Sequence, residues 1–141
     1  MKKILFICLF IGSFSGIFSQ NASSVIYLST SDFLSKVYNF EKNPSVWVYE
    51  GDLPCIVDFY TDWCRPCREV APIVEEIARK YEGKIIVYKL NLDRERRTAA
   101  ALGIRAFPSF LFVPMQDIPT MLQGAMPLEE FERAINQILL K

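Results

Sequence analysis

The stretch CIVDFYTDWCRPC, residues 55–67, combines a nearly continuous apolar run with two closely spaced cysteines. The run from Cys55 to Tyr60 is too short for a helix, and its almost wholly apolar character is typical of a strand covered on both faces. We therefore expect the central strand of a sheet here. Cys64 and Cys67 follow where this strand has ended, and their C-x-x-C spacing makes them the first candidates for chemistry.

A helix is predicted directly after Cys64. Five apolar residues follow at the spacing i, i+3, i+4, i+7 and i+11, which places them on one face of a helix that ends near Gly83. Pro66 suits the first turn of this helix. Pro72 falls in its interior, where the missing N–H and a clash with the preceding turn predict a kink. The apolar face consists of Val70, Ile73, Val74, Ile77 and Tyr81.

The remaining chain alternates between strand-like and helix-like segments. Helices are expected after the N-capping residues Ser29 to Ser31, from a cap at Asp93 to Gly103, and after Pro127. This alternation, which closes with a hairpin and a helix, makes an α/β fold of one domain. The other strands are expected at Val25–Leu28, at Val46–Tyr49 on an edge, at Ile85–Leu90, and in a hairpin of Ser109–Val113 with Thr120–Gln123.

The N-terminus has the features of a secretory signal. Two lysines precede an apolar run, and small residues that suit a cleavage site follow it. The run is interrupted well before the roughly 20 residues that a membrane-spanning helix needs. We expect cleavage after Ser19, with Ser15 and Ala22 as alternatives. This divides the chain into a signal peptide, residues 1–19, and one domain, residues 20–141.

The composition excludes several classes of function. The chain has 141 residues with 16 basic and 16 acidic side chains. This balance argues against nucleic acid as the main partner, because neutralising phosphates supplies most of that affinity. The absence of histidine removes histidine metal sites, Ser/His/Asp and Cys/His hydrolases, and an imidazole general base. Any chemistry must therefore use cysteine, carboxylates, lysine, tyrosine or the backbone.

Removal of the signal peptide leaves three cysteines, because Cys8 lies within it. Cys55 is interpreted as a small buried hydrophobe. A zinc site at Cys64 and Cys67 is disfavoured, since zinc needs about four ligands and no histidine is present. A purely structural bridge is disfavoured as well, because so short a loop restrains the unfolded chain little. Thiol–disulfide exchange is the leading interpretation, and no metal or cofactor is expected.

Residues 57–67, VDFYTDWCRPC, resemble the signature of the thioredoxin family, in which V-D-F leads into W-C-x-P-C. The resemblance covers roughly residues 25–140, which makes it far more specific than a lone C-x-x-C. It implies a thioredoxin fold, in which α-helices flank a mixed central β-sheet. Three further matches follow in the expected order: KLNLD at residues 89–93, GIRAFP at residues 103–108, and Gly124 with Ala125.

The chain departs from the family pattern at two places. The segment 39–52 is longer than in the smallest members, and Arg65 stands where cytosolic thioredoxins usually have Gly. Two interpretations of Arg65 stay open. In the first, its permanently charged guanidinium favours the Cys64 thiolate and makes the protein more oxidising. In the second, it points to solvent and recognises acidic clients.

The resemblance implies roles for four residues. At the start of a helix, unpaired N–H groups favour the thiolate of Cys64, which attacks a client disulfide. Cys67, expected to be the more buried of the two, then resolves the mixed disulfide. Asp58 lies in an apolar strand, so burial should raise its pKa. The resemblance implies that Asp58 transfers the proton of Cys67, with Lys89 close by.

The resemblance also implies a client-binding surface. The Phe107–Pro108 peptide bond should be cis and face the cysteines, so that the backbone of Phe107 pairs with an extended client segment. Trp63, next to the nucleophile, should provide an aromatic platform. The implied surface consists of Trp63, Arg65, Pro66, Phe107 and Pro108.

Together these features predict an exported thiol–disulfide oxidoreductase, a protein-disulfide reductase of the periplasm, with secretion as the second choice. Its partners would be disulfide-bearing client proteins and a membrane-embedded electron donor, because cytosolic reductants do not reach that compartment. We expect a monomer with no nucleic-acid partner and no stable membrane insertion after signal cleavage. The alternative is a thioredoxin-fold binding or holdase module whose cysteines are incidental.

Overall fold

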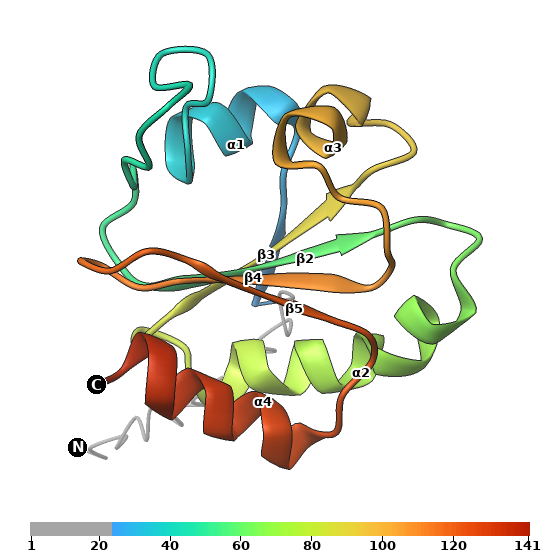
Figure 1. Cartoon of the computed structure of the whole chain (residues 1–141). Helices are drawn as coiled ribbons and strands as arrows, with labels where there is room; N and C mark the ends of the chain where they lie inside the picture. Colours follow the sequence, from blue (N-terminus) through green and yellow to red (C-terminus); the bar gives the residue numbers. More distant parts are fainter. Residues whose placement is uncertain (1–23) are drawn as a thin grey trace, which may run out of the picture.

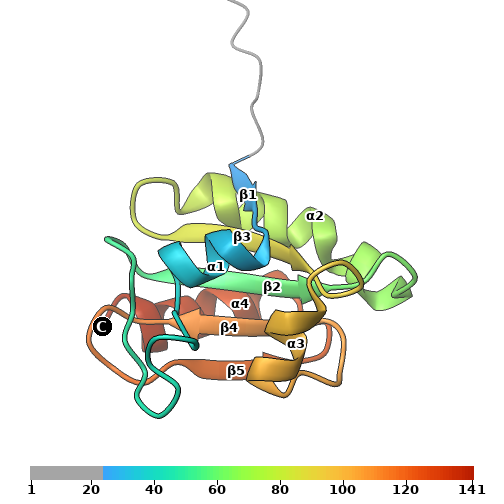
Figure 2. The same cartoon turned by 90° about the horizontal axis from the view of Figure 1, so that it is seen from above.

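The computed structural model describes residues 24–141, which contain one five-stranded sheet. The strand order is β1-β3-β2-β4-β5 (Figure 2). The strands are Val25–Tyr27 (β1), Cys55–Tyr60 (β2), Ile86–Asn91 (β3), Ser109–Val113 (β4) and Thr120–Gln123 (β5). The helices are Thr30–Lys36 (α1), Arg65–Lys80 (α2), Arg96–Leu102 (α3), Leu128–Ala134 (α4) and the π-helical turn Ile135–Leu139 (η1) that continues α4.

The position of β2 in the middle of the sheet confirms the interpretation of its sequence. β2 pairs in parallel with β3, where Cys55 faces Ile86, and antiparallel with β4, where Cys55 faces Val113. Every residue of β2 is buried except Tyr60 at its end, which is partly exposed. A strand with neighbours on both edges and helices on both faces is buried on both faces, which explains why apolar residues predominate and do not alternate with polar ones, apart from Asp58.

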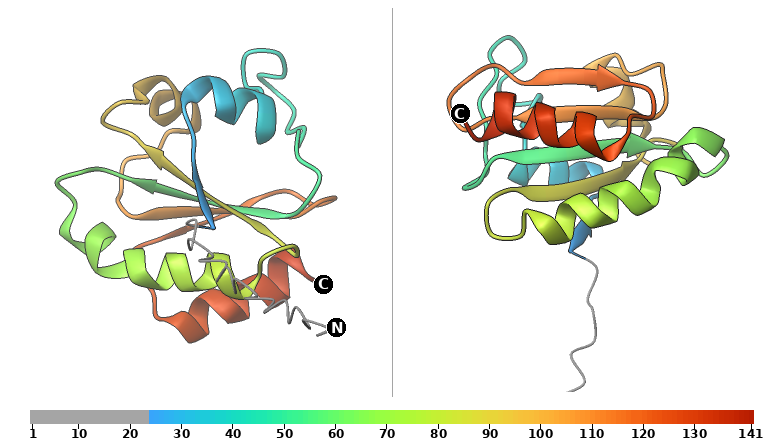
Figure 3. Two further views of the ribbon diagram at one scale, coloured as in Figure 1. Left: turned by 180° about the vertical axis from the view of Figure 1, so that it is seen from behind. Right: turned by 90° about the horizontal axis from the view of Figure 1, so that it is seen from below.

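Helices cover both faces of the sheet and give the molecule three layers (Figure 1). α1 and α3 lie on one face, whereas α2 and α4 lie on the other (Figures 1 and 3). Val57 and Phe59 belong to the core beneath α1 and α3, and Ile56 belongs to the core beneath α2 and α4. Because side chains alternate along a strand, Asp58 and Tyr60 lie on the α2 face.

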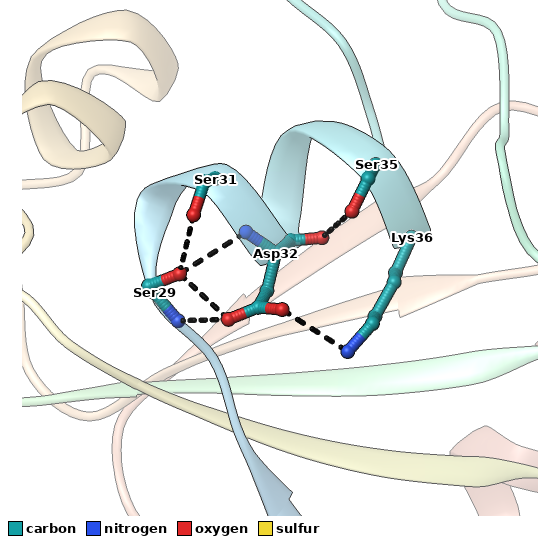
Figure 4. Close-up of polar contacts among 5 residues, drawn as sticks. All are labelled: Ser29, Ser31, Asp32, Ser35 and Lys36. Atoms are coloured by element: carbon teal, nitrogen blue, oxygen red, sulfur yellow. Dashed lines mark hydrogen bonds and ion pairs between the residues drawn. The ribbon is translucent and has the colours of Figure 1, made fainter.

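α1 begins with a capping box at the predicted position. The Ser29 hydroxyl accepts a hydrogen bond from the backbone N–H of Asp32, and the Asp32 carboxylate accepts one from the backbone N–H of Ser29, both at 3.1 Å (Figure 4). These bonds satisfy two amides that the start of a helix leaves unpaired. The carboxylate also forms an ion pair with Lys36, one turn later.

α2 carries the predicted apolar face and contains Pro72 in its interior. Val70, Val74 and Ile77 are buried in the core between this helix and the sheet. Pro72 cannot donate a hydrogen bond to the Arg68 carbonyl four residues earlier. The first turns of α2 lie at an angle to the rest of the helix (Figure 1), as the predicted kink requires.

The predicted edge strand Val46–Tyr49 does not form. Tyr49 makes only an isolated bridge with Tyr38, and β1 and β5 are the edges of the sheet. The segment packs through its side chains instead: the Trp47 ring stacks on Tyr38 with 4.3 Å between centroids, and Tyr49 donates a hydrogen bond to the Leu53 carbonyl at 2.5 Å. Aromatic residues, which are common in strands, here complete the core on the α1 side.

α3 begins at Arg96, so the predicted helix cap at Asp93 is wrong. The N-cap residue is Glu95, whose carboxylate accepts hydrogen bonds from the backbone N–H and the hydroxyl of Thr30 at 2.7 and 2.6 Å. This contact attaches α3 to the start of α1. The helix ends as predicted at Gly103, whose φ of 65° is left-handed and favours glycine.

The other elements agree with the sequence analysis to within a residue. β4 and β5 form the predicted antiparallel hairpin. β3 begins at Ile86 and ends at Asn91, one residue later than predicted at each end. α4 follows Pro127 as expected.

The predicted signal peptide, residues 1–19, lies outside the described residues, and so does the predicted cleavage site after Ser19. Between residues 24 and 141, none of the helices combines the length and the apolar character needed to cross a bilayer.

Candidate active site

The end of β2 and the start of α2 bring the two cysteines together. Cys64 is the N-cap residue of α2, and Cys67 lies in its first turn. Their sulfurs are joined in a disulfide, with 5.3 Å between the two Cα atoms. The backbone N–H of Cys67 donates a hydrogen bond to the Cys64 sulfur at 3.2 Å. The Cys64 sulfur thus occupies the position of a helix-capping acceptor.

The N-terminus of α2 suits a thiolate at Cys64. The first turn contains no acidic residue and contains both Arg65 and Arg68. Pro66 has no N–H and lies where an amide would have no helical partner in any case. The unpaired amides and the helix macrodipole favour negative charge at this end. The arrangement can therefore stabilise the Cys64 thiolate once the disulfide is reduced, and the thiolate is the form that attacks disulfides.

Both cysteines are nearly inaccessible in this oxidised form. Cys64 and Cys67 each expose 4% of their surface. The prediction that Cys67 is the more buried of the two is therefore wrong for the oxidised protein. The Cys64 sulfur lies against the first turn of α2, where the Cys67 amide donates to it.

A buried ion pair lies on the α2 face of the sheet. Asp58 on β2 and Lys89 on β3 are direct partners in the parallel register, and Lys89 Nζ lies 2.7 Å from Asp58 Oδ2. The lysine and aspartate side chains expose only 7% and 1% of their surface. Burial raises the pKa of the Asp58 carboxyl because it disfavours the charged form, and the Lys89 ammonium opposes this increase in part. The predicted burial of Asp58 and its proximity to Lys89 are confirmed.

A cleft of about 240 Å³ lies beside Cys67 and reaches Lys89, the lysine of this pair. Cys67 and Lys89 both line it. Asp58 Oδ1 is buried and has no hydrogen-bond partner among the described residues, so this oxygen is available to accept a proton. The cleft thus brings Cys67 and the lysine partner of Asp58 to one surface. The other residues that line the cleft are Tyr27, Tyr60, Thr61, Asp62, Arg68 and Ala71.

Trp63 is an exposed aromatic residue next to the disulfide, with 68% of its surface accessible. Its indole N–H donates a hydrogen bond to Asp93 Oδ1 at 3.1 Å, and the backbone N–H of Asp62 donates one to Asp93 Oδ2 at 3.1 Å. Asp93 thereby fixes the turn before Cys64.

This role of Asp93 differs from the helix cap that its sequence position predicts. A signal was available in the order of the elements. Asp93 follows β3 directly, as Cys64 follows β2, and the carboxyl ends of parallel strands meet at one edge of a sheet. Both residues therefore had to lie at the same end of the molecule.

The loop before β4 meets the cysteine segment at this end of the sheet. The Phe107–Pro108 peptide bond is cis, as predicted. The Phe107 ring contacts the Trp63 ring edge to face, with 5.8 Å between centroids. The Pro108 carbonyl accepts a hydrogen bond from the backbone N–H of Gly124 at 2.9 Å, which attaches the loop to the end of β5. Segments that are distant in sequence thus meet at Trp63, the residue before Cys64.

Known proteins share this combination of fold and cysteine pair. The family model for Thioredoxin matches residues 27–137. The chain belongs to the thioredoxin family. A thioredoxin of Borreliella burgdorferi is 38% identical over 110 residues, which are 78% of this chain and 93% of that protein. A thioredoxin of Haemophilus influenzae is 31% identical over 115 residues, which are 82% of this chain and 97% of that protein.

Family membership settles two of the predictions made from the sequence. The mixed sheet with helices on both faces is a thioredoxin fold, as expected. The bonded pair Cys64–Cys67 in a thioredoxin-family chain makes the protein a thiol–disulfide oxidoreductase.

Arg65 distinguishes this chain from the usual thioredoxin pattern. Its Nε lies 2.8 Å from Glu69 Oε1, one turn along α2, and 82% of its side chain is exposed. An exposed ion pair of this kind is weak and screened by salt. Glu69 reduces the net positive charge that Arg65 presents to Cys64, while the guanidinium stays accessible to other molecules. Pro66, the next residue, is exposed as well.

Cys55 is separate from this site. It is the first residue of β2, has no exposed surface and carries a free thiol. Burial raises the pKa of this thiol to about 12, because the charged thiolate is disfavoured in the core. A thiol that stays protonated and inaccessible is not a nucleophile. The interpretation of Cys55 as a buried hydrophobe is confirmed.

Proposed function

We propose that this thioredoxin-family protein is exported and reduces disulfides of client proteins, with Cys64 as the attacking and Cys67 as the resolving cysteine. The observation that supports this proposal most directly is the position of the Cys64–Cys67 disulfide at the N-terminus of α2. The buried pair of Asp58 and Lys89 on the face that α2 covers supports it further. A scaffold that only binds proteins would need neither feature.

In the first step, the Cys64 thiolate of the reduced protein attacks one sulfur of a client disulfide. A bond forms between Cys64 Sγ and that client sulfur, the client disulfide breaks, and the other client sulfur leaves as a thiolate. The N-terminus of α2, with its unpaired amides and no acidic residue in the first turn, favours the attacking thiolate.

In the second step, Cys67 attacks the Cys64 sulfur of the mixed disulfide. The Cys64–Cys67 disulfide forms, the client leaves as a dithiol, and the protein has transferred two electrons to it. Cys67 must lose its proton before it attacks. Asp58 is the base that we assign, because burial raises its pKa toward that of a thiol and its Oδ1 is free to accept the proton.

Clients bind at the end of the sheet where the disulfide lies. Pro108 has no N–H, so the backbone of Phe107 is left to pair with an extended client segment. The exposed ring of Trp63 offers apolar contact on one side of that segment. Arg65 and Pro66 border the disulfide on α2, and the exposed guanidinium suits clients with an acidic residue near their cysteine.

Export follows from the signal-like sequence of residues 1–19. The mature protein, residues 20–141, then works in the periplasm as a monomer. Cytosolic reductants do not reach this compartment, so the dithiol must be regenerated there. We assign this step to a membrane-embedded protein that carries electrons across the bilayer by thiol–disulfide exchange.

Reduction of insulin by dithiothreitol, followed through the turbidity of the released chains, tests the activity. We expect catalysis by residues 20–141 and by the control variant Cys55→Ala, and none by Cys64→Ser. The holdase alternative predicts the opposite: no catalysis by the folded wild type, and suppression of client aggregation that survives replacement of both Cys64 and Cys67 by serine. That pattern would overturn the proposed function.

A further inference from the structure

The buried ammonium of Lys89 has two neighbours that stabilise it. One is the Asp58 carboxylate, with 2.7 Å between Nζ and Oδ2. The other is the ring of Tyr60, whose centroid lies 4.8 Å from Nζ. A lysine ammonium within about 6 Å of an aromatic ring is attracted by the negative face of the ring, and the attraction is largest when water is excluded. Tyr60 therefore replaces part of the solvation that Lys89 loses.

Among the described residues, Lys89 donates a hydrogen bond to Asp58 Oδ2, and no residue donates one to Asp58 Oδ1. The orientation of this carboxylate therefore depends on where the lysine lies. Lys89 also lines the cleft beside Cys67, which gives its flexible side chain an alternative position in water. The Tyr60 ring, together with the Asp58 carboxylate, favours the inward position of the ammonium over the outward one.

We propose that Tyr60 is a positioning residue for the resolving step: its ring holds the Lys89 ammonium against Asp58 and thereby keeps the carboxylate ready for the Cys67 proton. The inference rests on the proposed function and extends it to a residue outside the cysteine motif. It assigns the role to the aromatic ring and not to the phenol hydroxyl.

The ionisable groups that share this cleft determine its pH response. Cys67 and Arg68 face it from α2, Tyr27 faces it from β1, and Asp62 faces it from the turn after β2. With the ammonium displaced, the Asp58 carboxylate loses its partner and its charged form becomes less stable. A smaller fraction of Asp58 is then ionised at neutral pH, so the resolving step slows and its pH dependence moves to higher pH.

Two substitutions separate the ring from the hydroxyl. Tyr60→Leu removes the ring, and we expect release of client from the mixed disulfide to slow by about two- to fivefold at pH 7, the factor that a cation–π contact of ordinary strength represents. Tyr60→Phe keeps the ring and should match the wild type. An effect of Tyr60→Phe equal to that of Tyr60→Leu would assign the role to the hydroxyl and overturn the proposal.

A second measurement does not depend on catalysis. Phenylalanine with one, two or three fluorine atoms at position 60 weakens the negative face of the ring stepwise with little change in shape. The titration of Asp58, followed by the NMR signal of its carboxyl carbon, should move to higher pH with each fluorine. An Asp58 titration that stays constant along this series overturns the proposal, whether or not Tyr60→Leu folds.

The series also separates this inference from the proposed function. If the wild type fails to reduce insulin, the reductase assignment fails, yet the Asp58 titration still reports whether Tyr60 acts through Lys89. In a Lys89→Met background the fluorine series should have no effect, because the cation is gone. A persistent effect in that background would show that Tyr60 acts through packing and would refute the positioning role.

Discussion

Asp58 is a carboxylate placed where water reaches it poorly, and its raised pKa reflects that burial. Its ordinary pKa is 3.8, and burial raises the folded-state value above this because the charged form is disfavoured. Between about pH 4 and its folded-state pKa, Asp58 therefore holds a proton in the folded state that it has lost in the unfolded state. Stability contributed by protonated Asp58 is complete below pH 4 and is lost as the pH rises through the folded-state pKa.

We therefore predict that Asp58→Asn stabilises the fold at neutral pH while slowing the resolving step. For each unit by which burial raises the pKa of Asp58, keeping this carboxylate charged lowers the free energy of unfolding by about 1.4 kcal/mol. Asparagine carries no charge and does not have this cost. The asparagine oxygen can still accept a hydrogen bond from Lys89, so the ammonium keeps a partner. Urea unfolding of the two proteins between pH 4 and pH 8 should show a difference that grows with pH.

Asp117→Asn is the matched control for this experiment. The Asp117 side chain is 62% exposed and pairs with Lys141 on the surface, so its replacement should change neither stability nor turnover measurably. Loss of stability in Asp58→Asn together with unchanged turnover would identify Asp58 as a structural residue.

The two cysteines should differ in the complexes that they trap. Cys64 lies at the N-cap of α2, where its thiolate is favoured, so Cys67→Ser should accumulate mixed disulfides between Cys64 and clients. Cys64→Ser should accumulate none, because Cys67 lies within the helix and does not make the first attack. Non-reducing electrophoresis of acid-quenched extracts measures both variants. Equal trapping by the two variants would contradict the assignment.

At the scale of single elements, α1 offers a test of stability that leaves the redox site untouched. Hydrogen bonds from Ser29 lower the pKa of Asp32 to about 2, and this carboxylate and the Ser29 hydroxyl together cap the helix (Figure 4). We predict that Ser29→Ala lowers the free energy of unfolding by about 1 kcal/mol at pH 7. The Asp32 carboxylate stabilises the fold only while it is charged. Its protonation as the pH falls from about 4 to 2 removes this contribution, so the difference in the free energy of unfolding between Ser29→Ala and the wild type should shrink over that range.

Ser35→Ala provides the control on the same helix. The Ser35 hydroxyl donates to the Asp32 backbone carbonyl and does not cap the helix (Figure 4), so its loss should change stability little. Both variants should reduce insulin at the wild-type rate. Chemical unfolding measures the stability of the two variants. An equal loss of stability in Ser29→Ala and Ser35→Ala would contradict a specific role of the capping box.

Elements whose pattern matches their surroundings could be predicted from sequence alone. The apolar run Cys55–Tyr60 predicts a strand, and the helical spacing after Cys64 predicts a helix. The two can be distinguished because a central strand has consecutive apolar residues, whereas a packed helix has apolar residues three or four positions apart. Val46–Tyr49 has the composition of a strand, but it pairs with neither edge strand of the sheet, β1 or β5. Side-chain packing of Trp47 on Tyr38 decided the outcome there, and no local pattern reports such a contact.

At the scale of the whole molecule, the site is built from segments that only the sheet brings together. The parallel register of β2 and β3 sets Asp58 opposite Lys89, and the contact of Phe107 with Trp63 joins the loop before β4 to the cysteine segment. The family resemblance predicted these neighbours. The link from Asp93 to Trp63 and the ring of Tyr60 beside Lys89 depend on side-chain directions that the sequence does not record.

Export is the last prediction, and it concerns the chain as a whole. A cut after Ser19 leaves every described strand and helix intact, because β1 begins at Val25. We predict that cells expressing the full chain yield a periplasmic protein whose mass and N-terminal sequence begin at Gln20. Leu9→Arg should block export and leave the precursor in the cell, because a charge interrupts the apolar run. The control Lys36→Arg keeps the charge of an exposed lysine on α1 and should be exported normally. Recovery of the wild-type chain at full length in the membrane fraction would show that residues 1–19 act as an anchor instead.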